Sequence, residues 1–350
     1  THAVALAAPN QVLMRMNLGV PVEEEKQTTG QFLEFWLREA VRGKKAPKTV
    51  AFYEQLVATH ITPSIGHITL GKLSPQHIQA FLNEKAKEPR TIKRVYKDGR
   101  VEKTEGPPLS ASTIGHLRAT LRAALTLAWK WGRIRENPAS RVTVPRAERK
   151  DPVYLTPEEV VALATASKDH YLGNLFVFAV NTGLRLAEAT GLTRRDVDPE
   201  FTSVAVSSKL QRVDGQLTLR ELKTRSSRRR LPLTKDAATA IRDQRANQML
   251  WSSNEGPGFN ALDLCFTTPA GNPLDPKTVD SNLKAFASNA GIEKKIGFHK
   301  LRHTTGTHLV ATGAPLNVVK EILGHSQIAI TANLYAHAVP AAHRSAFDAL

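Results

Sequence analysis

Apolar residues recur every three or four positions through the first part of the chain, a spacing typical of amphipathic helices. Thr28 and Ser74 stand where N-cap residues belong, and Pro75 occupies a first helical position. The sequence therefore predicts a helical domain over 28–140. Its four predicted helices cover residues 31–41, 46–61, 74–88 and 109–134.

The second half of the chain combines two periodicities. Helical spacing predicts helices at 156–167, 171–182, 299–310 and 328–337. Stretches rich in β-branched residues predict a three-stranded antiparallel sheet at 201–210, 216–223 and 228–233. The segment LDLCFTT around Cys265 predicts a further, buried strand. The expected fold class is mainly α with a small antiparallel β-sheet, arranged as a helical domain followed by an α+β domain.

Two connecting segments interrupt these patterns. Residues 90–108 contain Lys97-Asp98-Gly99-Arg100, which favours either a β-hairpin turn or a mobile loop. Residues 141–152 are rich in basic residues, and a capping sequence that begins at Thr156 signals the next helix. We place the domain boundary near Lys150, with a linker over 141–152, a second domain over 153–339 and a tail over 340–350.

Composition narrows the class of partner. The chain has 350 residues, enough for two domains, and 48 Lys and Arg against 32 Asp and Glu give it a formal charge of +16. Such a surplus favours a polyanion, and DNA, RNA and acidic membranes all fit charge alone. The one cysteine cannot form an intramolecular disulfide, which suits a reducing cytoplasm, and no apolar run approaches the ~20 residues that span a bilayer.

Residues suited to phosphate chemistry gather near the end of the chain. On a helix over 299–310, His299 and Arg302 share a face, where a guanidinium can bind phosphate oxygens and an imidazole can move a proton. His325 follows in a Gly-His-Ser turn, and Tyr335 can act as a nucleophile. Read alone, His299 and His303 fit a packed or capping pair. A zinc site there lacks the intervening Glu and a third ligand.

The segments HKLRH, LGHS and the Tyr beyond them resemble the C-terminal signature of the tyrosine recombinases, the phage-integrase family. Upstream, TGLRLAEATGL supplies an arginine with Glu188 one helical turn further on, and LKTRSSRRRLPL supplies a lysine that resembles the lysine of the family's β-hairpin. Lys300 departs from the Asp-like residue that is usual in the family. The ordered set of six matches consists of Arg185, Lys223, His299, Arg302, His325 and Tyr335.

The resemblance implies a helical core-binding (SAM-like) domain and an α+β catalytic domain that carries out transesterification without metal or cofactor. Arg185 and Arg302 would hold the scissile phosphate while Tyr335 attacks it. The remaining roles would fall to His299 as proton acceptor, Lys223 as acid toward the 5′-oxygen and His325 as hydrogen-bond donor. Glu188 is expected to orient Arg185 or support His299. Other basic residues are expected either to contact DNA or to remain solvated: Arg94, Lys97, Arg100, Arg141, Arg146, Arg149, Lys150, Arg225, Arg228, Arg229 and Lys300.

Partners and alternatives also follow from the resemblance. It implies four protomers on two DNA duplexes, an excisionase, a host DNA-bending protein, and a place in the bacterial cytoplasm. An integrase of a mobile element is favoured over a Xer-like resolvase, a type IB topoisomerase-like enzyme and a non-catalytic DNA-binding relative. Residues 1–27 are predicted to form a helix and linker, too short for the arm-binding domain of many integrases. The tail, 340–350, is expected to dock on a neighbouring protomer.

Overall fold

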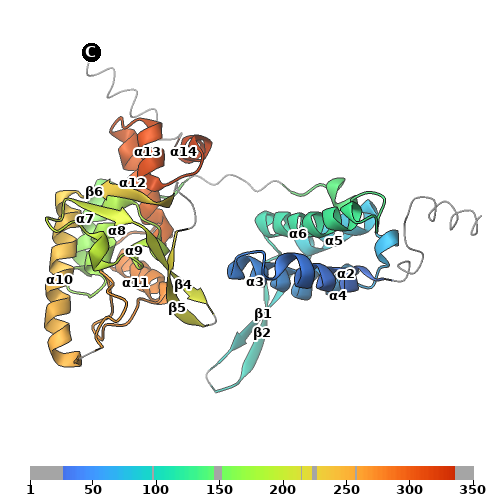
Figure 1. Cartoon of the computed structure of the whole chain (residues 1–350), viewed down its shortest axis with the longest axis horizontal. Coiled ribbons are helices and arrows are strands. Elements are labelled where there is room, and N and C mark those ends of the chain that lie inside the picture. Colours follow the sequence, from blue (N-terminus) through green and yellow to red (C-terminus); the bar gives the residue numbers. More distant parts are fainter. Residues whose placement is uncertain are drawn as a thin grey trace, which may run out of the picture. The chain divides into compact units, whose positions relative to one another are not determined.

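The computed structural model describes residues 27–96, 98–145, 152–213, 215–222, 227–256 and 258–335, and for 92–95 it describes the backbone alone. The chain divides into two compact units, Thr1–Arg149 and Lys150–Leu350. Figure 1 shows helices in both units and strands in each. Among the described residues, no helix is both long enough and apolar enough to cross a membrane.

The first unit is a bundle of helices with one β-hairpin (Figure 1). The four predicted helices are present, two of them continued by π-helical turns. The elements are α2 (Thr29–Trp36), η2 (Leu37–Val41), α3 (Pro47–Leu56), η3 (Val57–Ile61), α4 (Thr62–Ile65), η4 (Leu70–Lys72), α5 (Pro75–Lys87), β1 (Arg90–Val95), β2 (Val101–Gly106), α6 (Ala111–Lys130) and η5 (Pro138–Ser140).

Side-chain caps fix where these helices begin. Thr28 and Ser74 each accept a hydrogen bond from the backbone N–H three residues on, and Ser110 does the same before α6. The apolar faces meet in one core, whose fully buried members include Phe32, Leu33, Ile78, Ile114 and Leu121. The predicted N-caps at Thr28 and Ser74 are confirmed.

Residues 90–106 form a hairpin, which resolves the choice between a turn and a mobile loop. β1 and β2 pair antiparallel from Arg90 opposite Gly106 to Val95 opposite Val101. At its tip Gly99 has a φ of 82°, and the Arg100 guanidinium lies 4.5 Å from the Tyr96 ring centroid. Figure 1 shows the hairpin projecting from the helices of its unit.

In the second unit, helices surround the core and two short pairs of strands lie beside the helices (Figure 1). Its elements are α7 (Pro157–Ser167), α8 (Gly173–Thr182), α9 (Leu186–Ala189), η6 (Arg194–Asp196), β3 (Ser203–Val206), β4 (Ser208–Val213), β5 (Gln216–Glu221), β6 (Arg229–Pro232), α10 (Lys235–Glu255), α11 (Pro276–Asn289), α12 (Phe298–Ala311), α13 (Leu316–Leu323) and α14 (Ile328–Tyr335).

The prediction of a three-stranded sheet in this unit was wrong. Its first strand divides at Ser207, so that β3 pairs with β6 while β4 pairs with β5, both antiparallel. Side-chain bonds explain the division: the Ser207 hydroxyl donates to Asp196 at 2.8 Å, and the Ser208 hydroxyl donates to the Gly191 carbonyl at 2.7 Å. These bonds hold Ser207 and Ser208 against η6 and the end of α9. The chain changes its pairing from β6 to β5 at this point.

The strand predicted around Cys265 was also wrong, although the cysteine is buried. The segment forms isolated bridges at Leu264 and Thr267. Its backbone pairs with residues 192–194 only locally, the Cys265 N–H donating to the Leu192 carbonyl at 2.8 Å. Polar side chains supply further bonds: the Asn260 amide accepts from the Leu264 N–H and donates to its carbonyl, both at 2.8 Å, and Gln248 donates to the same carbonyl at 3.2 Å. The backbone is thus satisfied without a ladder.

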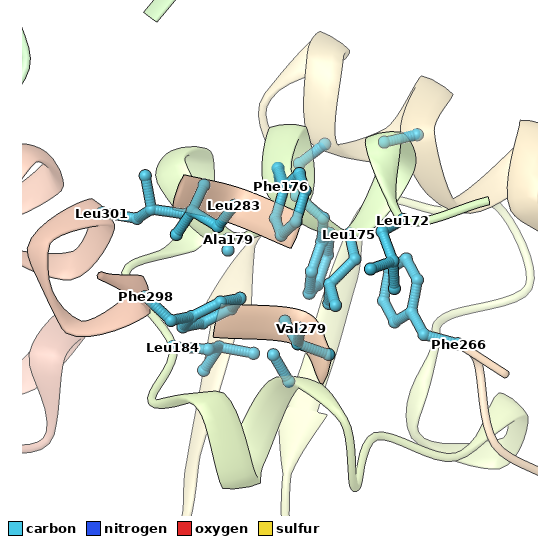
Figure 2. Close-up of a cluster of buried hydrophobic side chains, with 14 of the residues drawn as sticks. Leu172, Leu175, Phe176, Ala179, Leu184, Phe266, Val279, Leu283, Phe298 and Leu301 are labelled. Carbon is cyan, nitrogen blue, oxygen red and sulfur yellow. The ribbon is translucent and has the colours of Figure 1, made fainter. Parts of the chain in front are cut away.

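Helices α8, α11 and α12 enclose the main core of the second unit (Figure 2). Phe176 and Ala179 from α8 lie beside Leu283 from α11, with Leu301 from α12 next to them. Thr305 on α12 donates to the Val180 carbonyl of α8 at 2.7 Å, which fixes one helix against the other. A rigid α12 is important because it carries both His299 and Arg302.

Several predictions fall outside the described residues and stay predictions. They concern the segment 1–27 except its last residue, the tail over 340–350, the side chain of Arg94, and the residues Lys97, Arg146, Arg149, Lys150, Lys223 and Arg225.

Candidate active site

Three arginines from different elements converge on the C-terminal end of α13. Arg229 of β6 donates to the Ile322 carbonyl at 2.7 Å, Arg302 of α12 donates to the Leu323 carbonyl, and Arg185 donates to the Gly324 carbonyl at 3.2 Å. The last carbonyls of a helix have no partner within it and carry the negative end of its dipole. The end of α13 therefore gathers three positive charges on consecutive carbonyls.

Two glycines allow this approach. Gly324 ends α13 in the left-handed conformation with φ 62°, and a Cβ there would lie 2.9 Å from Nη1 of Arg229. Gly183 ends α8 in the same way with φ 63°, and a Cβ there would lie 2.7 Å from the Leu323 side chain. The Gly183 carbonyl accepts from Arg302 at 2.8 Å, so Arg302 bridges the ends of α8 and α13.

One carboxylate balances part of this charge. Glu188, 3% exposed, accepts from Nη1 of Arg185 at 2.8 Å and from Nη2 of Arg229 at 3.0 Å. Its second oxygen also accepts from the Arg185 backbone N–H at 3.1 Å, because Arg185 is the N-cap of the short helix α9. Burial alone would raise the pKa of Glu188, but Arg229 and then Arg185 hold it below its ordinary value.

Arg302 is buried to 2% exposure. Burial, followed by the positive charge of Arg185, lowers the pKa of its guanidinium, whereas Glu188 opposes that shift. A guanidinium remains charged over the physiological range, and its bonds to two carbonyls compensate for the water that burial removes. Arg185 differs, since its side chain is 39% exposed and can reach a ligand from solvent.

Three histidines line the same region. The ring centroids of His299 and His303 lie 4.7 Å apart, and His325 places Nδ1 2.9 Å from the Thr331 hydroxyl. Burial, then Arg302 and Arg185, lower the pKa of His325 to about 4, and the same causes lower the pKa of His299. Both imidazoles are therefore neutral at pH 7, and His299, at the exposed edge, is able to accept a proton.

Tyr335 lies at the end of α14 with 0% exposure. Its ring centroid is 6.3 Å from that of His303, and its buried hydroxyl has no hydrogen-bond partner among the described residues. Burial raises the pKa of Tyr335 to about 12, although Arg302 pulls it in the opposite direction. The phenol is thus neutral here, and it becomes a strong nucleophile only when a base takes its proton.

The arrangement brings together five of the six residues that the sequence singled out, namely Arg185, His299, Arg302, His325 and Tyr335, while the sixth lies outside the described residues. Glu188 contacts both the side chain and the backbone N–H of Arg185. Sequence reasoning missed Gly306, whose position faces the Tyr335 ring, and it assigned Arg229 to the surface. Nothing in the sequence around Gly306 marks it as a contributor to the site.

The expectation that Arg229 contacts DNA or stays solvated does not agree with the structure. Its side chain is 8% exposed and is bonded to Glu188 and to two backbone carbonyls. Alternation along β6 could have revealed this, because Arg229 is two positions from the buried Leu231 and so shares its face. Arg228, by contrast, has a side chain 55% exposed, in agreement with a surface role.

Chemically, the site can bind an oxyanion and move protons around it. Arg185 and Arg302 supply charge near a phenol that is a potential nucleophile, and the neutral imidazoles of His299 and His325 lie near the two arginines. Such donors stabilise charge that develops on a phosphate during displacement. Across the described part of the chain, no three His, Cys, Asp or Glu side chains gather in a way that could hold a metal ion.

Fold and site together define a tyrosine-type site-specific recombinase. Residues 153–341 match the model of the phage integrase family, and residues 28–86 match that of the phage integrase N-terminal SAM-like domain. Because the first match covers more than half of the chain, the protein belongs to the phage integrase family. The predicted family, fold class and enzyme class are confirmed.

Curated relatives agree with this family assignment. A tyrosine recombinase XerC-like protein of Caldanaerobacter subterraneus subsp. tengcongensis is 28% identical over 369 positions, covering 100% of this chain and 89% of that protein. Tyrosine recombinase XerC of Xanthomonas axonopodis pv. citri is 30% identical over 233 positions, covering 65% and 68% respectively. Both names describe recombinases of the tyrosine type.

Solved structures show the same fold. The Tn1549 transposon integrase in complex with a circular intermediate DNA superposes with a TM-score of 0.74 at 24% identity, covering 92% of this chain and 99% of that chain. A lambda integrase dimer bound to a COC′ core site gives a TM-score of 0.64 at 16% identity, covering 93% and 80%. The likeness extends over both units of the chain.

Proposed function

We propose that the protein is a DNA integrase that cuts and rejoins strands at specific sites through a 3′-phosphotyrosine intermediate. The observation that supports this most is the convergence of Arg185 and Arg302 on the end of α13, in the same buried region as Tyr335. A phosphodiester placed between two guanidiniums and a phenol is set up for in-line displacement.

In the proposed step, the Tyr335 oxygen bonds to phosphorus as the bond from phosphorus to the 5′-oxygen breaks. His299 accepts the phenol proton, and the released 5′-oxygen takes a proton from Lys223. One phosphodiester replaces another, so the 5′-hydroxyl of a second strand can reverse the step. His325 donates a hydrogen bond to a phosphate oxygen. Because its pKa is low, the imidazole is neutral and has one ring N–H for this bond.

We further propose that basic residues follow the DNA backbone. Arg100 and Arg141 have side chains 69% and 66% exposed, and the chain's surplus charge of +16 favours a polyanion. Contacts to phosphate position a protein without selecting a sequence. The proposed contact residues are Arg94, Lys97, Arg100, Arg141, Arg146, Arg149, Lys150, Arg225, Arg228 and Lys300.

The biological reaction we propose is integration and excision of a mobile element in the bacterial cytoplasm. Four protomers would hold two duplexes and exchange strands in pairs through a Holliday junction, with an excisionase and a host DNA-bending protein as partners. A similar solved structure, a lambda integrase tetramer bound to a Holliday junction, supports this assembly. The tail over 340–350 would dock on a neighbouring protomer.

Three other functions would use the same fold. A Xer-like resolvase is favoured by the names of the curated relatives, which are XerC proteins. A type IB topoisomerase-like enzyme would relax any supercoiled DNA without paired sites. A DNA-binding protein without catalysis is disfavoured by the presence of the full set of six residues.

The test is to incubate the protein in excess EDTA with supercoiled DNA that carries the region flanking its gene, and to quench with detergent. The integrase proposal expects a covalent protein–DNA adduct that Tyr335→Phe abolishes, at positions confined to one site. Adducts spread over any supercoiled DNA would favour a topoisomerase. Adducts that persist in the variant would overturn Tyr335 as nucleophile, and none in either protein would point to the wrong DNA or to a binding protein.

A further inference from the structure

We propose that Arg229 is a positioning residue for strand cleavage: it holds Glu188, the end of α13 and the β6 side of the lysine-bearing connection in one fixed arrangement. This inference rests on the proposed function. Arg229 touches no substrate in the scheme above, and it acts through the residues that do.

The geometry uses all three nitrogens of one guanidinium. Nε donates to the Ile322 carbonyl at 2.7 Å, Nη1 donates to the Ser227 carbonyl at 3.1 Å, and Nη2 donates to Glu188 at 3.0 Å. The side chain is 8% exposed, and the carboxylate it meets is 3% exposed. A planar fork with fixed donor directions can join three such acceptors, whereas an ammonium group cannot match them all.

The first consequence concerns Arg185. Glu188 binds the Arg185 side chain through one oxygen, and its other oxygen lies between the Arg185 backbone N–H and Arg229. Arg229 therefore fixes the plane of the carboxylate, and the carboxylate fixes the guanidinium of Arg185. Without Arg229, the second oxygen would keep one donor and the carboxylate could rotate.

The second consequence concerns the turn after α13. Atoms of the Arg229 guanidinium lie close enough to Gly324 that an added Cβ would meet Nη1 at 2.9 Å. The carbonyl of Gly324 accepts from Arg185, that of Leu323 accepts from Arg302, and His325 follows at once. Arg229 thus lies against the turn on which both phosphate-binding arginines and one imidazole depend.

The third consequence concerns Lys223. Ser227 is the first described residue after the stretch that contains Lys223, and its carbonyl accepts from Arg229. One guanidinium therefore ties the far end of that connection to Glu188 in the site. A residue that positions Arg185 and also holds Ser227 would affect the chemical step more than the binding of DNA.

The experiment measures single-turnover adduct formation on DNA carrying the mapped site, together with the Kd for that DNA. Arg229→Lys keeps the charge and is expected to cleave ~10-fold more slowly, and Arg229→Met ~100-fold more slowly, because small misplacements of catalytic groups slow reactions by factors of that order. The Kd should change by less than about 3-fold in both, since a residue acting on the chemical step leaves ground-state binding intact.

Arg230→Met is the matched control. Arg230 is the next residue of β6, is exposed, and donates to the Ser203 hydroxyl at 2.9 Å, so removing its guanidinium should leave the cleavage rate unchanged. The pH profile adds a further readout, measured over the pH range in which circular dichroism shows each variant to be folded, so that a decrease in stability does not account for a shift. Removing Arg229 raises the pKa of Glu188. On acidification, Arg229→Met should therefore lose cleavage at a higher pH than the wild-type protein, whereas Arg230→Met should behave like the wild-type protein.

Combining the change with Glu188→Gln gives the second readout. If Arg229 acts through Glu188, the double variant should cleave no more than about 3-fold more slowly than the slower single variant. Full multiplication of the two effects would overturn the coupling, and a wild-type rate in Arg229→Lys would overturn the positioning role, even if Arg229→Met fails to fold. Absence of any adduct from the wild-type protein would instead overturn the proposed function, and this role with it.

Discussion

The ring of Tyr335 lies directly over Gly306 on α12, so closely that a Cβ added at Gly306 would be 2.2 Å from Cζ and 2.4 Å from the hydroxyl oxygen of the tyrosine. Only glycine leaves room for the tyrosine ring in this position over Gly306, which we call the seat of Tyr335. The hydroxyl held there is buried and has no hydrogen-bond partner among the described residues. Burial in this position raises the pKa of Tyr335 to about 12, so the phenol gives up its proton less readily there than in water.

We expect Gly306→Ala to displace Tyr335 from this seat. The atoms that would clash are the far end of a side chain, so the ring can move while α12 stays in place. Nitration by tetranitromethane, followed by mass spectrometry, measures the change: Tyr335 should be protected in the wild-type protein and modified in the variant. The other tyrosines of the chain act as internal standards.

Cleavage by Gly306→Ala should be at least as fast as in the wild-type protein, because leaving the seat breaks no hydrogen bond that the structure describes. Gly115→Ala is the control, since Gly115 is also helical and has nothing within 4 Å of an added Cβ. Continued protection of Tyr335 in Gly306→Ala would show that the seat does not govern its exposure.

A second prediction separates backbone strain from steric contact at the turn after α13. Gly324 has φ 62° and a Cβ there would press on Arg229, whereas Gly313 has φ 83° and open space around it. Both Ala variants should lose ~1 kcal/mol or more of unfolding free energy through strain. Only Gly324→Ala should also slow adduct formation. Chemical unfolding and cleavage rates measure the two effects, and equal cleavage by both variants would contradict the prediction.

The order and local spacing of Arg185, His299, Arg302, His325 and Tyr335 made them recognisable in the sequence, since each lies in a short motif. Helix caps such as Thr28 were equally visible, because an N-cap bonds to a residue three positions on. Local chemistry of this kind depends on neighbours in the chain, and the sequence contains it directly.

Contacts between distant segments were not visible in the same way. The division of the strand at Ser207 depends on Asp196, and the burial of Arg229 depends on Glu188, 41 residues earlier in the chain. A run of arginines predicts a basic surface on average, and nothing in the run marks the one that enters the interior. The alternation with Leu231 becomes informative only once β6 is located.

The third prediction concerns acid stability. The pKa of His325 in the folded protein is about 4, against ~6.5 for an unperturbed histidine. Between these values the unfolded chain binds more protons than the folded one, so the unfolding free energy should be complete above pH 6.5 and fall as the pH drops toward 4. Urea unfolding of the second unit at several pH values measures this slope.

His325→Asn is the variant that tests the assignment. Its amide can preserve the contact that Nδ1 makes with Thr331, at 2.9 Å, but does not titrate. The variant should therefore show a shallower fall in stability between pH 6.5 and 4 than the wild-type protein. The same slope in both would mean that another group, such as His299, accounts for it.

The last prediction concerns the β1–β2 hairpin. Its backbone register places two positively charged residues, Lys93 and Lys103, at facing positions, and Arg100 stands exposed at the tip. A hairpin of two strands gains little stability on its own, so charges of this kind fit a surface that meets DNA phosphate. Replacing Arg100 and Lys103 by Gln should then weaken DNA binding by removing counterion release.

The slope of log K against log salt should fall in magnitude by up to ~0.9 for each phosphate that the hairpin no longer neutralises, so by up to ~1.8 in the double variant. The rate of adduct formation at saturating DNA should not change, because the hairpin lies in the first unit and the reacting groups lie in the second. Lys44→Gln, which also removes an exposed charge from the first unit, is the control and should leave the slope unaltered. An unchanged slope in the double variant would show that the hairpin does not touch the phosphate backbone, and a slower adduct at saturation would indicate that it acts on the chemical step instead.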